Sequence, residues 1–134
     1  MSTTFSKQPI SEANEQKLFI KWLRLQHPNL IVIVSIGGIK LTLPQVMNQK
    51  ALGLTKGIPD IFIAEPNGKY CGLFIELKKS GTKLKTKKGT WINEHIEIQA
   101  EMIEKLKARG YYATFCIGFE EAKQTIDNYL KGDL

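Results

Sequence analysis

The sequence lacks the features that mark secreted, membrane-spanning and disulfide-rich proteins. It has two cysteines, Cys71 and Cys116, and their spacing does not match a metal-binding pair. We therefore expect two reduced thiols in the core of a cytosolic protein, with a disulfide between them as the alternative. No run of about 18 consecutive apolar residues occurs, so no membrane-spanning helix is expected. The stretch Met1–Pro9 is polar and lacks the apolar centre of a secretion signal, which favours a cytoplasmic protein.

Length and charge indicate one basic globular domain. The chain has 134 residues, which is enough for one domain with its own core. The apolar and charged fractions, 43% and 24%, are ordinary for such a domain. We expect residues 1–10 to form a flexible tail and residues 11–134 to form the domain. The net charge of +6 is concentrated in one segment, described below.

Hydrophobic periodicity and turn residues predict an α/β domain. Apolar residues at helical spacing indicate helices, with Ser11 as an N-cap and Gly110 after a helix end. Runs of β-branched residues between turn residues indicate strands. In chain order we expect a helix at 12–26, a buried strand at 30–36 ended by Gly37-Gly38, a short helix within 42–52, a hairpin of strands at 58–64 and 70–78, a helix at 93–109, a strand at 112–117 and a helix at 119–130. This order predicts a mixed central sheet of about four strands flanked by helices.

Two acidic residues interrupt apolar strand segments. Asp60 lies near the start of one strand of the predicted hairpin, and Glu76 lies inside the other. Because side chains alternate along a strand, Glu76 and Lys78 share one face. If the hairpin is antiparallel, Asp60 approaches Glu76, and two close carboxylates require a proton or a cation between them. The pattern therefore predicts a Mg²⁺ site beside a lysine. The alternative is a salt bridge of Glu76 with Lys78 or Lys79 on an exposed strand.

A lysine-rich segment begins directly after Glu76. It contains Lys78, Lys79, Lys83, Lys85, Lys87 and Lys88. One interpretation is a solvated, mobile loop, because like charges repel one another. The other is a loop that contacts phosphate groups of a nucleic acid. Its position immediately after Glu76 and Lys78 favours the phosphate-binding interpretation.

Polar residues also interrupt the apolar stripes of two predicted helices. Gln99 takes a position in the 93–109 helix where leucine is expected, and a buried, hydrogen-bonded amide is the plain alternative. In the first helix the stripe consists of Leu18, Phe19, Trp22 and Leu23. Glu12 and Glu15 lie on or beside this stripe, where a glutamate ordinarily sits at the edge with its carboxylate in water. Such exceptions on separate elements are expected where local rules are broken for function.

Together these motifs resemble a known nuclease family. Gly57-Ile58-Pro59-Asp60, then Phe74-Ile75-Glu76-Leu77-Lys78, then a helix with Gln99 and the following Gly110, are similar to the PD-(D/E)XK nuclease superfamily. The sequence most resembles the virus-type replication-repair nuclease (VRR-NUC) domain in its stand-alone phage and bacterial form, from about Ser11 to Leu130. It departs from the family at Ser35-Ile36, where asparagine often precedes the Gly-Gly pair, and in its long lysine-rich stretch before Gln99.

The resemblance implies a restriction-endonuclease-like fold and roles for individual residues. Asp60 and Glu76 would be metal ligands, helped by the backbone carbonyl of Leu77, and Lys78 would be the catalytic lysine. Gln99 would support the site, and Glu12 would complete the acidic cluster, with Glu15 in reserve. The lysines expected to contact DNA are Lys79, Lys83, Lys85, Lys87, Lys88, Lys40 and Lys56.

The resulting hypothesis is a Mg²⁺- or Mn²⁺-dependent endonuclease that hydrolyses phosphodiester bonds in branched DNA. The resemblance further implies a homodimeric Holliday-junction resolvase in the cytoplasm of a bacterial or phage-infected cell. Candidate dimer surfaces are the first helix around Trp22 and the segment Leu41–Leu54. Two alternatives belong to other classes: a non-catalytic DNA-binding module with a nuclease-like fold, and a scaffold protein in which Glu76 and Lys78 form only a salt bridge.

Overall fold

The computed structural model describes residues 12–35 and 42–134. The elements are α1 (Glu12–Gln26), β1 (Val32–Val34), α2 (Leu43–Ala51), β2 (Ile61–Ile63), β3 (Leu73–Lys78), α3 (Glu94–Ala108), β4 (Tyr112–Ile117) and α4 (Phe119–Lys131). Their order is the one that the sequence predicts, and β4 has the predicted bounds. The expected tail at 1–10, the Ser11 cap and the Gly37-Gly38 turn lie outside the described residues.

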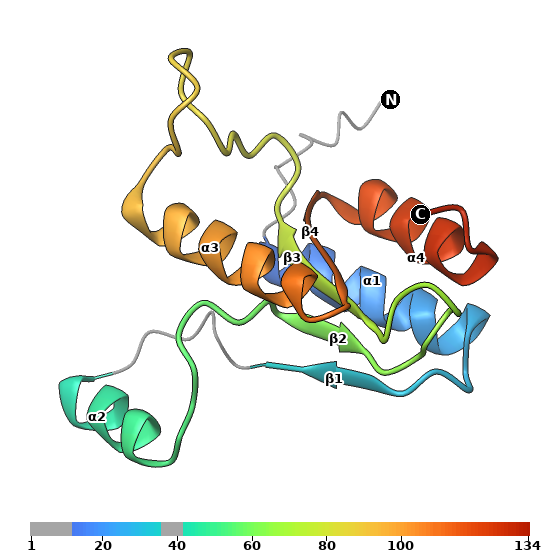
Figure 1. The fold of residues 1–134 in the computed structure, drawn as a ribbon, viewed down its shortest axis with the longest axis horizontal. Helices are drawn as coiled ribbons and strands as arrows, with labels where there is room; N and C mark the ends of the chain where they lie inside the picture. Colours follow the sequence, from blue (N-terminus) through green and yellow to red (C-terminus); the bar gives the residue numbers. More distant parts are fainter. Residues whose placement is uncertain (1–11, 36–41) are drawn as a thin grey trace, which may run out of the picture.

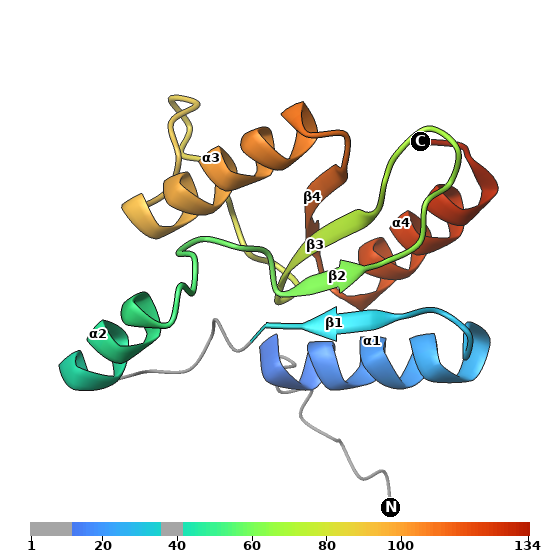
Figure 2. The same ribbon diagram turned by 60° about the horizontal axis from the view of Figure 1, so that its bottom comes forward.

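The four strands form one mixed sheet in the order β1-β2-β3-β4. The β1–β2 and β2–β3 pairs are antiparallel, and the β3–β4 pair is parallel, with α3 as the crossover between them. Helices α1 and α4 cover one face of the sheet and α3 covers the other, as Figures 1 and 2 show. The predicted α/β class with a mixed four-stranded sheet is therefore confirmed.

Strand β3 separates the apolar core from the opposite face of the sheet. Leu73, Ile75 and Leu77 are fully buried in the core with residues of α1 and α4. Burial contributes about 1.5–3 kcal/mol for each such side chain. The alternating residue Phe74 points the other way and stacks on Phe62, with 4.3 Å between the ring centroids. Alternation thus places Glu76 and Lys78 on the α3 side of the sheet, as the sequence predicts.

The inward position of Gln99 on α3 agrees with the prediction, whereas α1 differs from its predicted stripe. Helix α3 is capped by Asn93, whose side chain accepts a hydrogen bond from the Ile96 amide at 2.9 Å, and it buries Gln99 beside its apolar residues. Helix α1 buries Phe19 and Leu23 completely, but Leu18 is 45% exposed. The prediction for Leu18 was wrong because the inward stripe continues through Glu15 instead.

Strand β1 is a partly exposed edge strand and not the buried strand that the sequence predicts. It pairs with β2 only, within the part of the chain that the structure describes. Ile31, Ile33 and Val34 are exposed by 63%, 54% and 42%. A continuous β-branched run is typical of a strand covered on both faces, but here it marks an apolar sheet edge.

Helix α2 extends away from the sheet (Figure 1). Thr42 and Gln45 form a reciprocal capping box, and Pro44 lies in its first turn, so its start is fixed by local sequence. None of its residues is buried. Leu43 and Met47 are 72% and 62% exposed. The helix therefore gains little stabilisation from its own domain.

The prediction for the two cysteines is confirmed in part. Both cysteines are free, and Cys116 is buried in the core. Cys71, however, is exposed and precedes β3, so the prediction of two core thiols was wrong for this residue. Among the helices of residues 12–35 and 42–134, none has the length and apolarity needed to cross a membrane.

Candidate active site

The antiparallel β2–β3 hairpin brings Asp60 and Glu76 together. Ile61 pairs with Ile75, and one further step of the same register sets Asp60 opposite Glu76. The backbone N–H of Asp60 donates to Oε2 of Glu76 at 3.1 Å. The two residues are only 8% and 2% exposed. The predicted juxtaposition of these acids is therefore confirmed.

Lys78 and Gln99 converge on the other oxygen of Glu76. The Lys78 ammonium lies 3.4 Å from Oε1 of Glu76, and the Gln99 amide donates to the same oxygen at 2.8 Å from α3. Both residues are 7% exposed. Oε1 of Gln99 is also buried and accepts no hydrogen bond within the described part of the chain. Since a buried acceptor is costly to leave unsatisfied, this oxygen suits a water bound at the site.

The side chains of Leu77 and Glu15 stand apart from this group. The Leu77 side chain is fully buried in the core, so only its backbone carbonyl could contact a metal, and that role stays a prediction. The carboxylate of Glu15 instead accepts hydrogen bonds from Ser80 and Phe119. The side chain of Glu12 lies outside what the structure describes, so its role also stays a prediction.

Burial and a neighbouring negative charge make Glu76 a strong proton acceptor. Desolvation, followed by the charge of Asp60, raises the pKa of Glu76 from 4.5 to about 8, although Lys78 acts in the opposite direction. The two carboxylates therefore cannot both ionise at neutral pH unless a cation compensates them. A divalent metal is such a cation, and carboxylate oxygens are the ligands that Mg²⁺ prefers.

The residues present fit a metal centre in which Asp60 and Glu76 supply only some of the ligands and other groups supply the rest. Among the described side chains, no group of three His, Cys, Asp or Glu residues is placed to hold a metal. Within the described residues, Asp60 and Glu76 are the two that offer carboxylate oxygens at this point. Mg²⁺ commonly binds through one or two carboxylates together with waters and substrate phosphate. The pair therefore suits a Mg²⁺ ion that shares its ligands with a bound nucleic acid.

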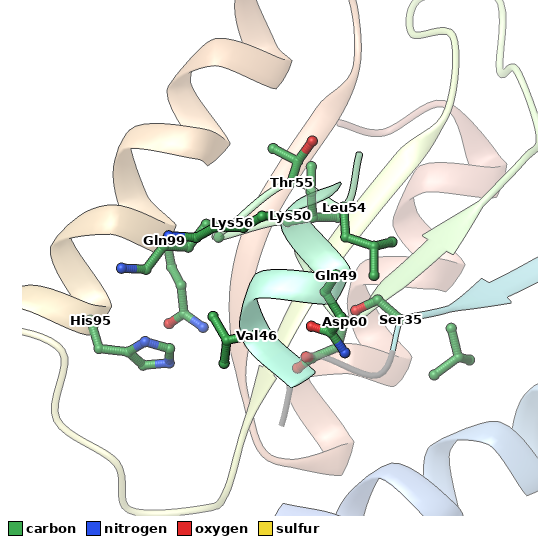
Figure 3. A pocket seen from close by; sticks show the side chains of 13 residues that line it. Ser35, Val46, Gln49, Lys50, Leu54, Thr55, Lys56, Asp60, His95 and Gln99 are labelled. Atoms are coloured by element: carbon green, nitrogen blue, oxygen red, sulfur yellow. The ribbon is translucent and has the colours of Figure 1, made fainter. Parts of the chain in front are cut away.

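A cavity of about 670 Å³ opens beside Asp60 and Gln99 (Figure 3). Its wall also includes Lys50 and Lys56 from the α2 region and His95 from α3. Lys56 was predicted to contact DNA, whereas Lys50 and His95 were assigned no role. The i, i+4 spacing of His95 and Gln99 is the signal that could have placed both on one helix face.

The lysine-rich segment forms a hydrogen-bonded β-ribbon over Lys83–Ile92, here called the basic ribbon. The Ile92 amide donates to the Leu84 carbonyl and the Thr86 amide donates to the Thr90 carbonyl, both at 2.8 Å. Between these pairs, Lys85 and Trp91 form an antiparallel bridge, and the Lys85 ammonium lies 4.7 Å from the Trp91 ring centroid. The segment is therefore folded, in contrast to the alternative interpretation of a solvated, mobile loop.

The basic ribbon extends past the end of β3 and leads into α3 (Figure 1). No aspartate or glutamate occurs between Glu76 and Glu94, so no acidic residue in this segment offsets its charge. The predicted DNA-contacting lysines of this segment are all exposed: Lys79, Lys83, Lys85, Lys87 and Lys88. Lys40 lies outside the described residues.

Fold and site together define the class of protein. A mixed sheet whose adjacent strands carry Pro59-Asp60 and Glu76-Leu77-Lys78 to one point is the arrangement of PD-(D/E)XK nucleases. The sequence profile of the VRR-NUC domain matches residues 8–120, so the chain belongs to the VRR-NUC family of these nucleases. A solved structure described as a VRR_NUC domain protein is 26% identical, with a TM-score of 0.70 over 92% of this chain and 91% of that one. The predicted family resemblance is confirmed.

The chain is also similar to part of a longer plant protein. Solanidine UDP-glucose glucosyltransferase 1 from Solanum tuberosum is 31% identical over 112 residues, which are 83% of this chain and 22% of that protein. The chain thus spans about a fifth of the length of this relative. The sugar transfer in that name describes the whole plant protein and is not carried over to this chain.

The raised pKa of Glu76 predicts how pH affects the metal-free protein. The folded state keeps a proton on Glu76 up to about pH 8, whereas the unfolded chain releases it near 4.5. This contribution to stability is full below about pH 4.5 and is lost as the pH rises through about 8. Glu76→Gln removes the titrating group, so the stability of the wild type relative to this variant should fall by up to about 5 kcal/mol over that interval.

Urea unfolding in EDTA at about pH 5, 7 and 8.5 measures this difference. Glu104→Gln is the matched control, because its side chain is 71% exposed and lies outside the site. A constant difference in unfolding free energy between wild type and Glu76→Gln at all three pH values would contradict the assignment.

Proposed function

We propose that the protein is a metal-dependent, structure-specific DNA endonuclease that hydrolyses phosphodiester bonds in branched DNA, as a Holliday-junction resolvase does. The observation that carries this proposal is the buried Asp60–Glu76 pair with Lys78 at 3.4 Å from the Glu76 carboxylate. A salt bridge with a purely structural role needs only one carboxylate. A second carboxylate beside it increases the free-energy cost of burying the site. Family membership adds independent support.

Each residue of the site has a role in this mechanism. Asp60 and Glu76 would hold Mg²⁺ or Mn²⁺, with the Leu77 carbonyl and Glu12 as proposed further ligands. When bound, such an ion lowers the pKa of a water molecule and neutralises charge on the phosphate. The Lys78 ammonium donates to a phosphate oxygen or holds the attacking water, and it offsets the negative charge that develops on the phosphoryl oxygens. Gln99 fixes the orientation of Glu76 through its 2.8 Å hydrogen bond.

Substitution of either acid tests this mechanism. Asp60→Asn and Glu76→Gln should each lower the cleavage rate by about 10²–10³-fold or more, because the site loses the charge that holds the cation. DNA affinity should persist, since the exposed lysines supply the phosphate contacts. The assay uses a four-way junction, a flap, a splayed arm and a linear duplex, each with Mg²⁺, with Mn²⁺ and with EDTA.

Glu104→Gln is again the control and should cut at the wild-type rate. Faster cutting of the four-way junction than of the linear duplex supports the resolvase proposal. Equal cutting of all four substrates would indicate a nuclease that does not distinguish branched from linear DNA. Salt-sensitive DNA binding by the wild type without cleavage in either metal would instead indicate the non-catalytic DNA-binding module.

The basic ribbon supplies a second test, directed at DNA binding. Lys85, Lys87 and Lys88 lie on the ribbon and are exposed. Their joint replacement by glutamine should weaken binding at least about tenfold and reduce the salt slope by up to about 2.7, because three phosphate contacts are lost. Replacing Lys105, Lys107 and Lys131 removes the same charge from exposed positions on α3 and α4. Filter binding across a salt series should separate the two triple variants, and identical slopes would argue against a ribbon–DNA contact.

We further propose that the protein acts as a symmetric homodimer. Cutting two strands of a junction requires two sites at a fixed separation. Helix α2 buries none of its residues and exposes Leu43 and Met47, and β1 leaves Ile33 exposed at a sheet edge. Of the two predicted dimer surfaces, the α2 segment is favoured, because Trp22 of α1 packs against Phe119 with ring centroids 6.4 Å apart. Leu41, at the start of that segment, lies outside the described residues.

A charge at Met47 tests the dimer. Met47→Glu should raise the dimer dissociation constant at least about tenfold, because it places a carboxylate in an apolar contact. Asn48→Glu introduces the same charge one residue further along α2 and should have a smaller effect. Sedimentation equilibrium measures both. A monomeric wild type at about 100 µM, where even weak specific dimers form, would exclude the dimer.

The proposed compartment is the cytoplasm of a bacterial or phage-infected cell. Two free cysteines, one of them exposed, are compatible with a reducing environment.

A further inference from the structure

A buried glutamate on α1 ties together the ends of β3 and β4. Glu15 is 1% exposed. Its Oε1 accepts hydrogen bonds from the backbone N–H of Ser80 at 3.0 Å and from the Ser80 hydroxyl at 2.5 Å. Its Oε2 accepts a hydrogen bond from the Phe119 N–H at 2.6 Å. One carboxylate on α1 thus joins the segment that leaves β3 to the first residue of α4.

Helix α4 depends on Glu15 for a cap that its own sequence does not provide. Its N-cap residue is Gly118, which has no side chain and a φ of +87°. A Cβ at this position would lie 2.6 Å from the Ser80 hydroxyl and 3.3 Å from Oε2 of Glu15. A carboxylate at a helix N-terminus is favourable because it accepts from free N–H groups and complements the helix dipole. Here the carboxylate comes from another helix.

The same contacts reach the catalytic strand. Lys78 pairs with Ile117 at the end of the parallel ladder, and the Gly118 N–H donates to the Lys78 carbonyl at 2.7 Å. Ser80 is two residues beyond Lys78. The backbone of Lys78 is therefore held from β4 through Gly118, and the chain immediately after it is held by Glu15.

We propose that Glu15 is a positioning residue, which fixes Lys78 and the start of the lysine-rich segment, and that it is not a metal ligand. This inference rests on the proposed nuclease function. The three hydrogen bonds to Glu15 already occupy both of its oxygens. Moreover, Glu15 reaches Ser80 and Phe119, whereas Glu76 is contacted by Gln99 of α3.

The position of Lys78 matters because its ammonium acts over a short distance. It lies 3.4 Å from Glu76, and misplacement of a catalytic group by about 1 Å can cost 10²-fold in rate. Release of Ser80 would let the chain after β3 move, and Lys78 is the last residue of that strand. Metal affinity, in contrast, depends on Asp60 and Glu76, which the hairpin register positions independently.

The test compares Glu15→Gln, Glu15→Ala and Ser80→Ala with Asp60→Asn. Glutamine keeps one acceptor oxygen, so Glu15→Gln should retain more activity than Glu15→Ala. We expect kcat to fall about 10–100-fold for Glu15→Ala and less for Ser80→Ala. The Mg²⁺ concentration for half-maximal rate and the DNA dissociation constant should stay within about threefold of wild type. Asp60→Asn should change the Mg²⁺ requirement.

Two-dimensional NMR provides a readout that does not depend on cleavage. In Glu15→Gln, the amide signals of Ser80 and Phe119 and the Lys78 side-chain ammonium signal should shift, while amides of the β2–β3 hairpin stay in place. Ser80→Ala retains the Glu15 carboxylate, so it tests the same contact even when a Glu15 variant does not fold. It should reproduce a weaker form of the same shifts.

The outcomes separate the inference from the proposed function. A folded Glu15→Ala variant that needs at least about tenfold more Mg²⁺ would make Glu15 a metal ligand and overturn the inference, while the nuclease function stands. Unchanged kcat with an unshifted Lys78 signal would also overturn it. A wild type that cuts no DNA with either metal would refute the proposed function itself.

Discussion

The buried carboxylate of Glu76 is the interaction on which the site depends. Removing such a charge from water is costly, and the facing carboxylate of Asp60 increases the cost. Three donors offset part of it: the Asp60 N–H, the Gln99 amide and the Lys78 ammonium. The remaining imbalance appears as the raised pKa of Glu76. A site with this imbalance accepts either a proton or a cation, and a cation brings the chemistry that phosphodiester hydrolysis requires.

The sheet topology explains why these groups meet. The β2–β3 register sets Asp60 opposite Glu76. The chain crosses from β3 to the parallel strand β4 through α3, and this helix places Gln99 against Glu76. The crossover also contains the basic ribbon, which begins shortly after Lys78 and ends before the Asn93 cap of α3. A DNA molecule bound along the ribbon would therefore be held by a segment connected at both ends to elements of the candidate site. One continuous stretch of chain therefore joins the lysines of the basic ribbon to Lys78 and Gln99.

The sequence predicted the positions of Asp60, Glu76 and Lys78 better than it predicted their surroundings. Alternation in Leu73–Lys78 correctly separated the core residues from Glu76 and Lys78, because a short-range period decides it. The exposure of Leu18, of Cys71 and of β1 was missed. Each depends on which element packs against the segment, and local pattern carries no information about that. The folded state of the basic ribbon was missed for a similar reason, since lysine content says nothing about the Thr86–Thr90 pairing.

Glu15 and Glu76 show how two equally buried carboxylates acquire different roles. Both are at most 2% exposed. Glu15 receives backbone donors from Ser80 and Phe119, which the chain presents at the ends of β3 and β4. Such donors compensate a charge within the fold itself. Glu76 instead faces another carboxylate, so its charge is compensated fully only when something outside the chain binds. Burial of an acid therefore does not by itself make it a candidate catalytic residue, whereas incomplete compensation of its charge does.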